Sequence, residues 1–307
     1  MAFFQEAQIW SAVPTPLDEQ LHPDESALEL MIEASIQDGV NGLFLAGTCG
    51  EGPWLPDADR LALIRSAVRI AAGRVTLAVQ VTDNSAERVR ENILRAADAG
   101  AGVAIVAAPP VFLNATAARI VRHFNRCADN SPIPVGIYDL GEHRPIRIPL
   151  EHVLDIYAHP QVGLVKDSSG QSARMAAAVE ARRSHPKLCL LGGDEFRFLE
   201  YADAGYDGVM FGGAVVTARA LREIATLLSR GKRREAESLD AATRDRLLGI
   251  YGGTSIACWL TGLKYWMVRR GLFSACHSFL EYPLHEDCRN FIERDVVTHG
   301  GAVSAHG

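Results

Sequence analysis

The sequence predicts an α/β fold, a (β/α)₈ TIM barrel with a C-terminal helical extension, and three observations support this prediction. Short apolar runs of strand length return eight times, and each is followed by a stretch with helical periodicity. The runs are almost continuously apolar, as expected of parallel strands that are buried on both faces. Eight such units in about 230 residues match the ~250-residue size of this barrel.

The strands are predicted where the apolar runs begin, and the helices fill the stretches between them. The runs begin at Gln8, Gly42, Val75, Val103, Pro134, Val162, Leu188 and Gly208. The helices are predicted at Asp24–Asp38, Asp57–Ala72, Ser85–Ala99, Thr116–Asp129, Leu150–Ala158, Gln171–Ser184, Glu195–Ala204 and Thr217–Ser229. Several open with Asp, Ser or Thr, whose side-chain oxygens accept from the free N–H groups of a first helical turn. An open, doubly wound sheet is the alternative, but no GxGxxG motif follows the first strand.

The pattern changes after about Arg230, and the barrel is therefore assigned to residues 1–230 and a helical region to 231–307. Helices are predicted there at Lys232–Ile250, Thr254–Arg270 and Leu284–Val297. The second of these carries an apolar stripe with two tryptophans, which we expect to pack against the barrel or a partner subunit.

Composition excludes several classes of protein. The chain of 307 residues is 48% apolar and 22% charged, with a net charge of −6 and no tract rich in Lys or Arg, so nucleic acid is not an expected partner. No apolar run approaches the ~18 residues of a membrane span, and the first residues do not form a secretory signal, which predicts a cytoplasmic protein. Neither the cysteines nor the histidines have metal-ligand spacing, so no metal and no cofactor are expected.

One lysine stands at the end of a predicted strand, where barrel enzymes place their chemistry. The chain has 31 basic residues but only four lysines, and Lys166 ends the sixth apolar run. Arginine would serve equally well there for charge, but it cannot act as an amine nucleophile. An ion pair with Asp167 or Asp194 is the structural alternative. The other lysines have simpler explanations; Lys264, for example, lies beside the apolar stripe of its helix.

Two further strand ends carry polar groups. In the segment Gly47–Gly52 the glycines allow successive N–H groups to point at a small anion, and the Thr48 hydroxyl adds a donor. A plain tight turn is the alternative. Tyr138 ends the fifth strand, where its hydroxyl can relay a proton if it lies near Lys166, although a packed aromatic is the simpler reading.

These residues resemble the pyruvate-dependent class I aldolases typified by dihydrodipicolinate synthase and N-acetylneuraminate lyase. Four landmarks match in order: Thr15-Pro16, the segment Gly47–Glu51 for the family's G-[TS]-T-G-E, Tyr138 opening a degenerate Y-N-x-P, and Lys166 in Lys-Asp-Ser-Ser-Gly. The match covers the whole barrel, and it implies a homotetramer.

The resemblance also implies roles for the site residues. Lys166 would form a Schiff base with the keto carbon of pyruvate or another 2-oxo acid, whose carboxylate would lie against the Thr48 hydroxyl and the Cys49 N–H. Tyr138 would be the acid/base group with Thr48 in its relay. The backbone near Gly193 and Met210 would line the pocket, and the pair Asp194-Glu195 is similar to the acidic pair with which the neuraminate lyase holds sugar hydroxyls. Charge at a helix N-terminus is the alternative for that pair.

The sequence departs from the synthase pattern at two places. Phe112 stands where the synthase has a second tyrosine that reaches a neighbouring subunit's site. The arginine that grips the distal carboxylate of the synthase's aldehyde substrate is replaced by His143, with Arg144 one position later.

The sequence thus predicts a lyase, an aldolase or dehydratase that uses Lys166 on pyruvate or a 2-oxo acid. A hydroxylated 2-keto-3-deoxy acid is favoured as substrate because the acidic pair suits hydroxyls, with an aldehyde as the other reactant. The alternatives are an authentic dihydrodipicolinate synthase and a non-catalytic barrel that binds a 2-oxo acid.

Overall fold

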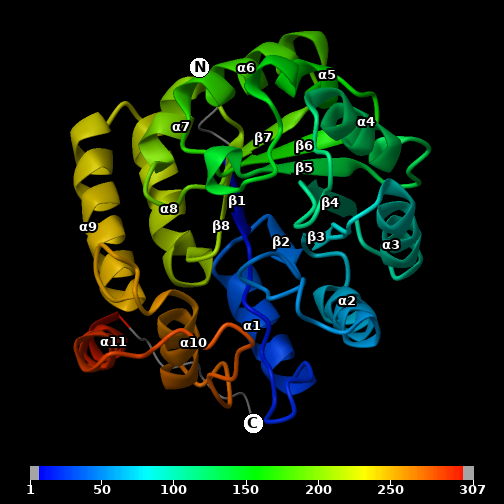
Figure 1. Cartoon of the computed structure of the whole chain (residues 1–307). Coiled ribbons are helices and arrows are strands. Elements are labelled where there is room, and N and C mark those ends of the chain that lie inside the picture. The colour runs from blue at the N-terminus through cyan, green and yellow to red at the C-terminus, as the bar shows by residue number, and fades with distance from the viewer. Residues whose placement is uncertain (1–6, 300–307) are drawn as a thin grey trace.

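Eight parallel strands close into a barrel in the computed structural model, which describes residues 7–299 (Figure 1). Each strand pairs with the next along the chain, and β1 pairs with β8 to complete the circle. The predicted TIM barrel is therefore confirmed. The strands are β1 (Gln8–Ser11), β2 (Gly42–Leu45), β3 (Thr76–Gln80), β4 (Val103–Ala107), β5 (Val135–Asp139), β6 (Val162–Asp167), β7 (Cys189–Gly192) and β8 (Gly208–Phe211).

A helix follows each strand and covers the outside of the barrel (Figure 1). These helices are α1 (Glu25–Gln37), α2 (Asp57–Ala71), α3 (Ala86–Asp98), α4 (Ala117–Ala128), α5 (Val153–Tyr157), α6 (Ser172–Ser184), α7 (Phe198–Ala204) and α8 (Ala214–Ser229). Two short 3₁₀ helices, η1 (Gly141–His143) and η2 (Leu150–His152), lie between β5 and α5. Asp24 and Ser85 accept N–H groups of the first turns of α1 and α3, as their residue types predict.

Three helix starts of the barrel differ from the predictions by three residues, and in one of them the predicted start, Leu150, begins the 3₁₀ helix η2 while α5 follows from Val153. We expected the eighth helix to begin at Thr217, but α8 begins at Ala214 because the Gly213 carbonyl already accepts the N–H groups of Val216 and Thr217. We expected the seventh to begin at Glu195, but α7 begins at Phe198 because a turn comes first, in which the Asp194 carboxylate accepts the Phe196 N–H.

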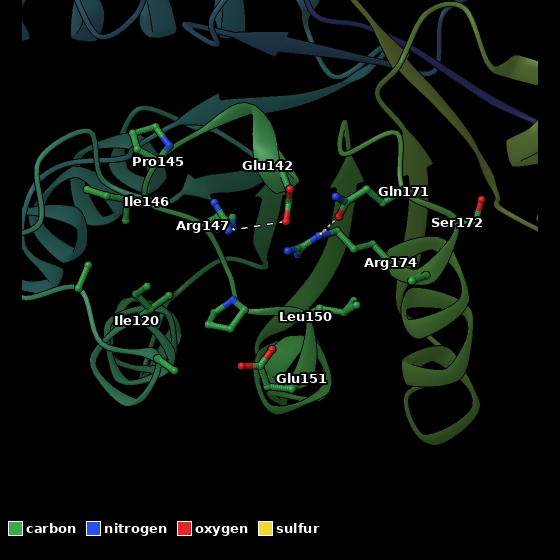
Figure 2. Close-up of a pocket in the computed structure, with 14 residues that line it drawn as sticks. Ile120, Glu142, Pro145, Ile146, Arg147, Leu150, Glu151, Gln171, Ser172 and Arg174 are labelled. Carbon is green, nitrogen blue, oxygen red and sulfur yellow. Dashed lines mark hydrogen bonds and ion pairs between the residues drawn. The ribbon is translucent and has the colours of Figure 1, made fainter.

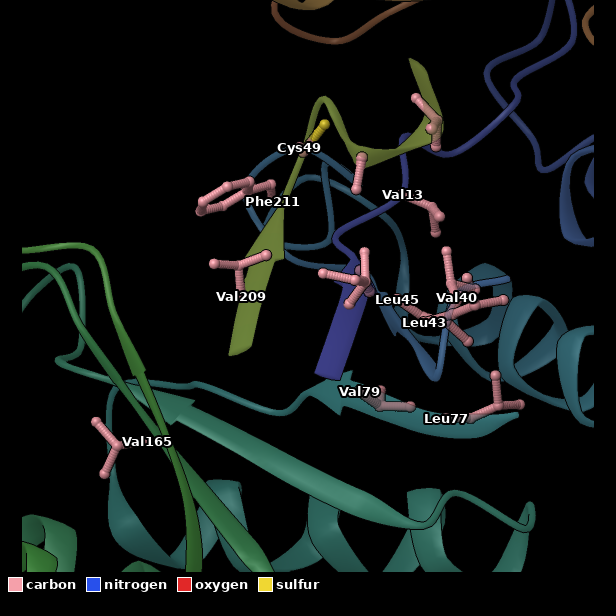
Figure 3. Packing of buried hydrophobic residues seen from close by; sticks show 14 of the residues in the cluster. Val13, Val40, Leu43, Leu45, Cys49, Leu77, Val79, Val165, Val209 and Phe211 are labelled. Atoms are coloured by element: carbon pink, nitrogen blue, oxygen red, sulfur yellow. The ribbon is translucent and has the colours of Figure 1, made fainter. Parts of the chain in front are cut away.

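Side chains of each strand alternate between two apolar clusters, as barrel geometry requires. One cluster fills the interior and includes Trp10, Phe44, Ala78 and Met210. The other lies between strands and helices, where Leu43, Leu45, Leu77 and Val79 are among its members (Figure 3). A residue two positions from an interior side chain on the same strand therefore also faces the interior.

Three more helices, α9 (Arg233–Tyr251), α10 (Trp259–Arg269) and α11 (Glu286–His299), form the C-terminal extension. α9 lies along α8, and α10 and α11 pack against α9 and each other (Figure 1). The second helix of this region was expected from Thr254, but it begins at Trp259; Ile256 precedes it with a positive φ and a side chain that is 40% exposed. Leu260, Leu263 and Met267 of the apolar stripe are fully buried. Among residues 7–299, every helix is too short or too polar to cross a bilayer.

Candidate active site

Lys166 lies inside the barrel near the carboxyl end of β6, with only 5% of its surface exposed. Its Nζ lies 4.4 Å from the centre of the Tyr138 ring and 4.9 Å from that of Phe44. Within residues 7–299 no ion pair joins it to Asp167 or Asp194. The Asp167 carboxylate instead accepts from the Ser169 amide and hydroxyl and from the Tyr206 hydroxyl. The amine thus lies against two aromatic rings, and it forms no ion pair with a carboxylate in the described part of the chain.

Tyr138 is brought next to Lys166 because the two residues pair in register across β5 and β6. The Tyr138 side chain is buried, and its ring meets Phe44 edge to face, with centres 6.0 Å apart and an interplanar angle of 89°. The Tyr138 ring therefore lies close to the Lys166 amine. Phe44, which sequence reasoning did not single out, is the second aromatic ring beside the amine.

Gly193 packs directly against the lysine from the end of β7. Its N–H donates to the Asp167 carbonyl at 2.7 Å. A Cβ at this position would lie 2.0 Å from the Ser168 hydroxyl and 3.1 Å from Cε of Lys166, so only glycine fits without displacing them. The Ser168 hydroxyl is buried and has no hydrogen-bond partner. Sequence reasoning missed this group, although its place two residues after Lys166 was a signal for it.

The turn after β2 is held in a fixed shape that presents Thr48 at the barrel mouth. Glu51 adopts a positive φ of 55°, and a Cβ on Gly52 would lie 1.8 Å from the Ala46 carbonyl. The Thr15 hydroxyl donates to the Gly50 carbonyl at 2.6 Å. The Cys49 side chain is buried, and burial raises the pKa of its thiol well above the ordinary range. Cys49 therefore stays protonated, which leaves its backbone N–H as its contribution to a ligand.

Glu51 and Lys264 form a buried ion pair that sequence reasoning missed. Both side chains have no exposed surface, and Lys264 Nζ lies 2.5 Å from Glu51 Oε1. The other Glu51 oxygen accepts from the Ser278 hydroxyl at 2.8 Å and the Phe279 N–H at 2.6 Å. The expectation that Lys264 merely lies beside an apolar stripe is wrong: this lysine anchors the Thr48 turn to the C-terminal extension.

A cavity of about 440 Å³ opens at the mouth of the barrel, among the loops that follow β2, β3, β4 and β5. Thr48 and Arg144 both line this mouth pocket, together with Gln80, Ala107 and Leu140. His143 is exposed and does not line it. Of the two candidates for the arginine position, the structure therefore brings Arg144 to the pocket and leaves His143 outside.

A larger hollow, of about 680 Å³, lies elsewhere, between α4, the segment 142–151 and the start of α6 (Figure 2). Its two arginines are already paired. Arg174 Nη1 lies 2.7 Å from the Asp139 carboxylate, and Arg147 lies 3.6 Å from Glu142. Thr48 lines the mouth pocket but not this hollow, whereas Lys166 and Tyr138 line neither of the two cavities.

The acidic pair that follows β7 is split between two environments. Asp194 stabilises the turn before α7 through the Phe196 N–H. The half-buried Glu195 side chain turns the other way: one carboxylate oxygen accepts the Gly213 N–H at 2.5 Å, and both lie 3.1 Å from the Tyr251 hydroxyl at the end of α9. The two carboxylates thus have different hydrogen-bond partners, and Met210 lies in the buried interior of β8.

Glu195 is expected to make stability depend on pH. Burial raises its pKa from the ordinary 4.5 to about 7, although the hydrogen bonds from Gly213 and Tyr251 act in the opposite direction. The folded state therefore favours the protonated form, so the stabilisation is complete below pH 4.5 and is lost as the pH rises through about 7. We expect the free energy of unfolding of the wild type to fall by roughly 2–3 kcal/mol relative to Glu195→Gln over this range. Denaturant titrations of both proteins at several pH values test this, and a constant difference would contradict it.

Phe112 packs against its own chain. Its ring lies 5.3 Å from the His123 ring, and the Arg119 guanidinium lies 5.1 Å from its centre, both residues belonging to α4. The neighbouring Val111 and Leu113 side chains are 59% and 82% exposed. This loop therefore presents an apolar surface without a hydroxyl at the position of the second tyrosine.

No group of three or more His, Cys, Asp or Glu side chains in residues 7–299 is arranged to hold a metal ion.

Known proteins are similar to this chain in sequence and in fold. The model of the dihydrodipicolinate synthetase family matches residues 5–289. A protein of Stenotrophomonas maltophilia strain K279a, named 4-hydroxy-tetrahydrodipicolinate synthase, is 29% identical over 230 residues, which are 75% of this chain and 76% of that protein. A protein of the same name from Magnetococcus marinus is 25% identical over 278 residues, or 90% of this chain and 91% of its own length.

Solved structures share the fold. YagE of E. coli K12, a prophage protein of the dihydrodipicolinic acid synthase family crystallised with pyruvate, superposes with a TM-score of 0.84 at 20% identity, over 95% of this chain and 98% of that one. A monomeric dihydrodipicolinate synthase variant superposes with a TM-score of 0.85 at 18% identity, over 96% and 97% of the two chains.

Proposed function

Because the chain belongs to the dihydrodipicolinate synthetase family, whose model matches nearly its whole length, we propose that Lys166 is the residue that forms the Schiff base of this class I lyase. The observation that carries the proposal is the position of the amine. It lies inside the barrel beside the Phe44 and Tyr138 rings, no ion pair joins it to a carboxylate in the described part of the chain, and Gly193 leaves room beside it. Attack on a carbonyl requires the uncharged amine.

The reaction would begin when the Lys166 amine attacks C2 of the 2-oxo acid and water leaves, which forms a protonated imine. The Thr48 hydroxyl and the Cys49 N–H would bind the substrate carboxylate. In aldol cleavage the C4 hydroxyl loses its proton, the C3–C4 bond breaks and its electron pair passes into the imine, giving an enamine and an aldehyde. Tyr138 would carry the proton between C4 oxygen and solvent, with Thr48 in its relay. Protonation of the enamine at C3 and hydrolysis then release pyruvate and restore the amine.

A dehydratase would use the same imine differently. A proton leaves C3, the C4 hydroxyl departs as water after protonation, and hydrolysis releases an unsaturated 2-oxo acid. Both reactions require the part of the substrate beyond C3 to lie in the mouth pocket, which Thr48 and Arg144 line.

We propose a hydroxylated 2-keto-3-deoxy acid as the substrate. Phe112, which packs on α4 and has no hydroxyl, supports a substrate other than that of the synthase. Asp194 and Glu195 make different hydrogen bonds in the free protein. Both remain proposed pocket residues, together with Gly193 and Met210.

Authentic 4-hydroxy-tetrahydrodipicolinate synthase activity is the second candidate, and two observations favour it. The curated relatives carry that name. Arg144 also lines the mouth pocket, where it could bind the distal carboxylate of an aldehyde substrate. A homotetramer, predicted from the family resemblance, is likewise part of the proposal.

A two-part experiment tests the function. Incubation with pyruvate in deuterated water is expected to exchange the methyl protons, as followed by NMR, because enamine formation removes them. The enzyme is then given either a 2-keto-3-deoxyhexonic acid or pyruvate with the carboxylate-bearing aldehyde of the synthase. Faster turnover of the first is expected; faster turnover of the second would establish the alternative. A protein that binds pyruvate without any exchange would be a non-catalytic barrel.

A further inference from the structure

Gln80 ends β3 on the interior side of the barrel and lines the mouth pocket. Its neighbour two residues earlier, Ala78, belongs to the interior cluster, whereas Val79 faces the helices. The alternation of the strand therefore directs Gln80 toward the interior, where it is 7% exposed. The same cavity is lined by Thr48 and Arg144, so Gln80 shares the space assigned to the part of the substrate beyond C3.

The Gln80 carboxamide has an unused hydrogen-bonding group. Its Oε1 is buried and has no partner, a state that is uncommon for buried side-chain polar atoms. If the amide were turned over, an N–H group would occupy the same enclosed place. Either way a residue that lines the pocket carries a polar atom with no partner among residues 7–299, and a ligand that reaches this atom and pairs with it binds more tightly than one that does not.

Other polar groups of this wall are already occupied. Arg60 donates to Asp57 and Asn92, and Arg88 donates to Asp83. The Thr82 hydroxyl accepts the Ala107 N–H, and the side-chain amide oxygen of Asn84 accepts the Val111 N–H. These hydrogen bonds are made within the protein. The Gln80 carboxamide oxygen, in contrast, remains available to a ligand that enters the pocket.

We propose that Gln80 binds a hydroxyl group of the substrate beyond C4 and so determines specificity for polyhydroxylated 2-oxo acids. This rests on the proposed function, whose Schiff base fixes the 2-oxo end at Lys166. A hydroxyl both donates and accepts, so it can satisfy either orientation of the carboxamide. A methylene satisfies neither, and a carboxylate offers no donor to Oε1. Arg144, at the same pocket, is the group suited to a carboxylate.

The test compares two six-carbon substrates in which only the outer hydroxyls differ. One is a 2-keto-3-deoxyhexonic acid with hydroxyls on C4, C5 and C6, and the other is 4-hydroxy-2-oxohexanoate, with the C4 hydroxyl alone. Consumption of each is measured, because it reports both cleavage and dehydration. The wild type is expected to prefer the first substrate, and Gln80→Leu is expected to lower the ratio of the two kcat/KM values by about 10- to 100-fold.

Asn125 provides a matched control. Its Oδ1 is also buried without a partner, but it lies on α4 and does not line the mouth pocket. Asn125→Leu is therefore expected to leave the ratio unchanged. Gln80→Met, which has nearly the same shape as glutamine, gives the same comparison should the leucine variant fail to fold.

Three results would overturn the inference. The first is an unchanged ratio in folded Gln80→Leu or Gln80→Met, which would mean that the carboxamide has a structural role. The second is a wild type that exchanges pyruvate protons but prefers the substrate with one hydroxyl. The third is an equal loss in Asn125→Leu. Failure of the proposed function itself is recognised separately, by a wild type that shows no pyruvate exchange or that turns over pyruvate with the synthase's aldehyde faster than the 2-keto-3-deoxyhexonic acid.

Discussion

Replacing Lys166 by methionine is expected to lower kcat by at least about 10⁴-fold, because the imine cannot form without the amine. Lys166→Arg should be equally inactive, since a guanidinium keeps the charge but does not condense with a ketone. Turnover of the 2-oxo acid measures the loss. Borohydride added with pyruvate should reduce the imine and leave a pyruvyl group on Lys166 of the wild type, which mass spectrometry of the peptides detects.

Lys187 supplies the control for that experiment. It is an exposed lysine just before β7, so Lys187→Met removes one amine without touching the site. It should keep full activity and full labelling at Lys166. A pyruvyl group on a different lysine of the wild type, or near-normal turnover by Lys166→Met, would refute the assignment.

The second large effect is expected in stability. Lys264→Met leaves the Glu51 carboxylate buried with only the Ser278 hydroxyl and the Phe279 N–H as donors. Removing one partner of a buried pair typically costs about 3–5 kcal/mol, because the remaining charge is uncompensated. Chemical denaturation should show this loss as a lower midpoint. Combining Lys264→Met with Glu51→Gln removes both charges and is expected to restore part of the stability.

The exposed pair of Lys232 with Glu235 is the matched comparison, at 2.9 Å between Nζ and Oε1. Lys232→Met should change the free energy of unfolding by no more than about 1 kcal/mol, since water screens that pair. Equal effects of the two lysine substitutions would show that burial does not decide the strength of these interactions.

The barrel could be predicted from the sequence because each of its units is local. A buried parallel strand shows as a continuous apolar run, and the helix that follows it shows as a 3.6-residue period. Interior and exterior positions then follow from alternation along the strand. Lys166 and Tyr138 were found for the same reason: each ends such a run.

What could not be predicted depends on contacts between distant segments. Lys264 pairs with a carboxylate 213 positions away, and Glu195 turns toward Tyr251 and Gly213 instead of starting the next helix. Nothing in the residues near Lys264 identifies its partner. Gln80 was missed because a single glutamine at the end of an apolar run has no spacing pattern; only the enclosed cavity reveals its unpaired oxygen.

The hydrogen bonds that join β1 to β8 also have a consequence for synthesis of the chain. Gln8 pairs with Gly208, so the edge of the first strand finds its partner only after some two hundred further residues have been made. Until then the growing chain has an unpaired edge at β1, and unpaired strand edges tend to associate with other chains. On the ribosome, this protein is expected to need protection by a chaperone until its last strand has emerged.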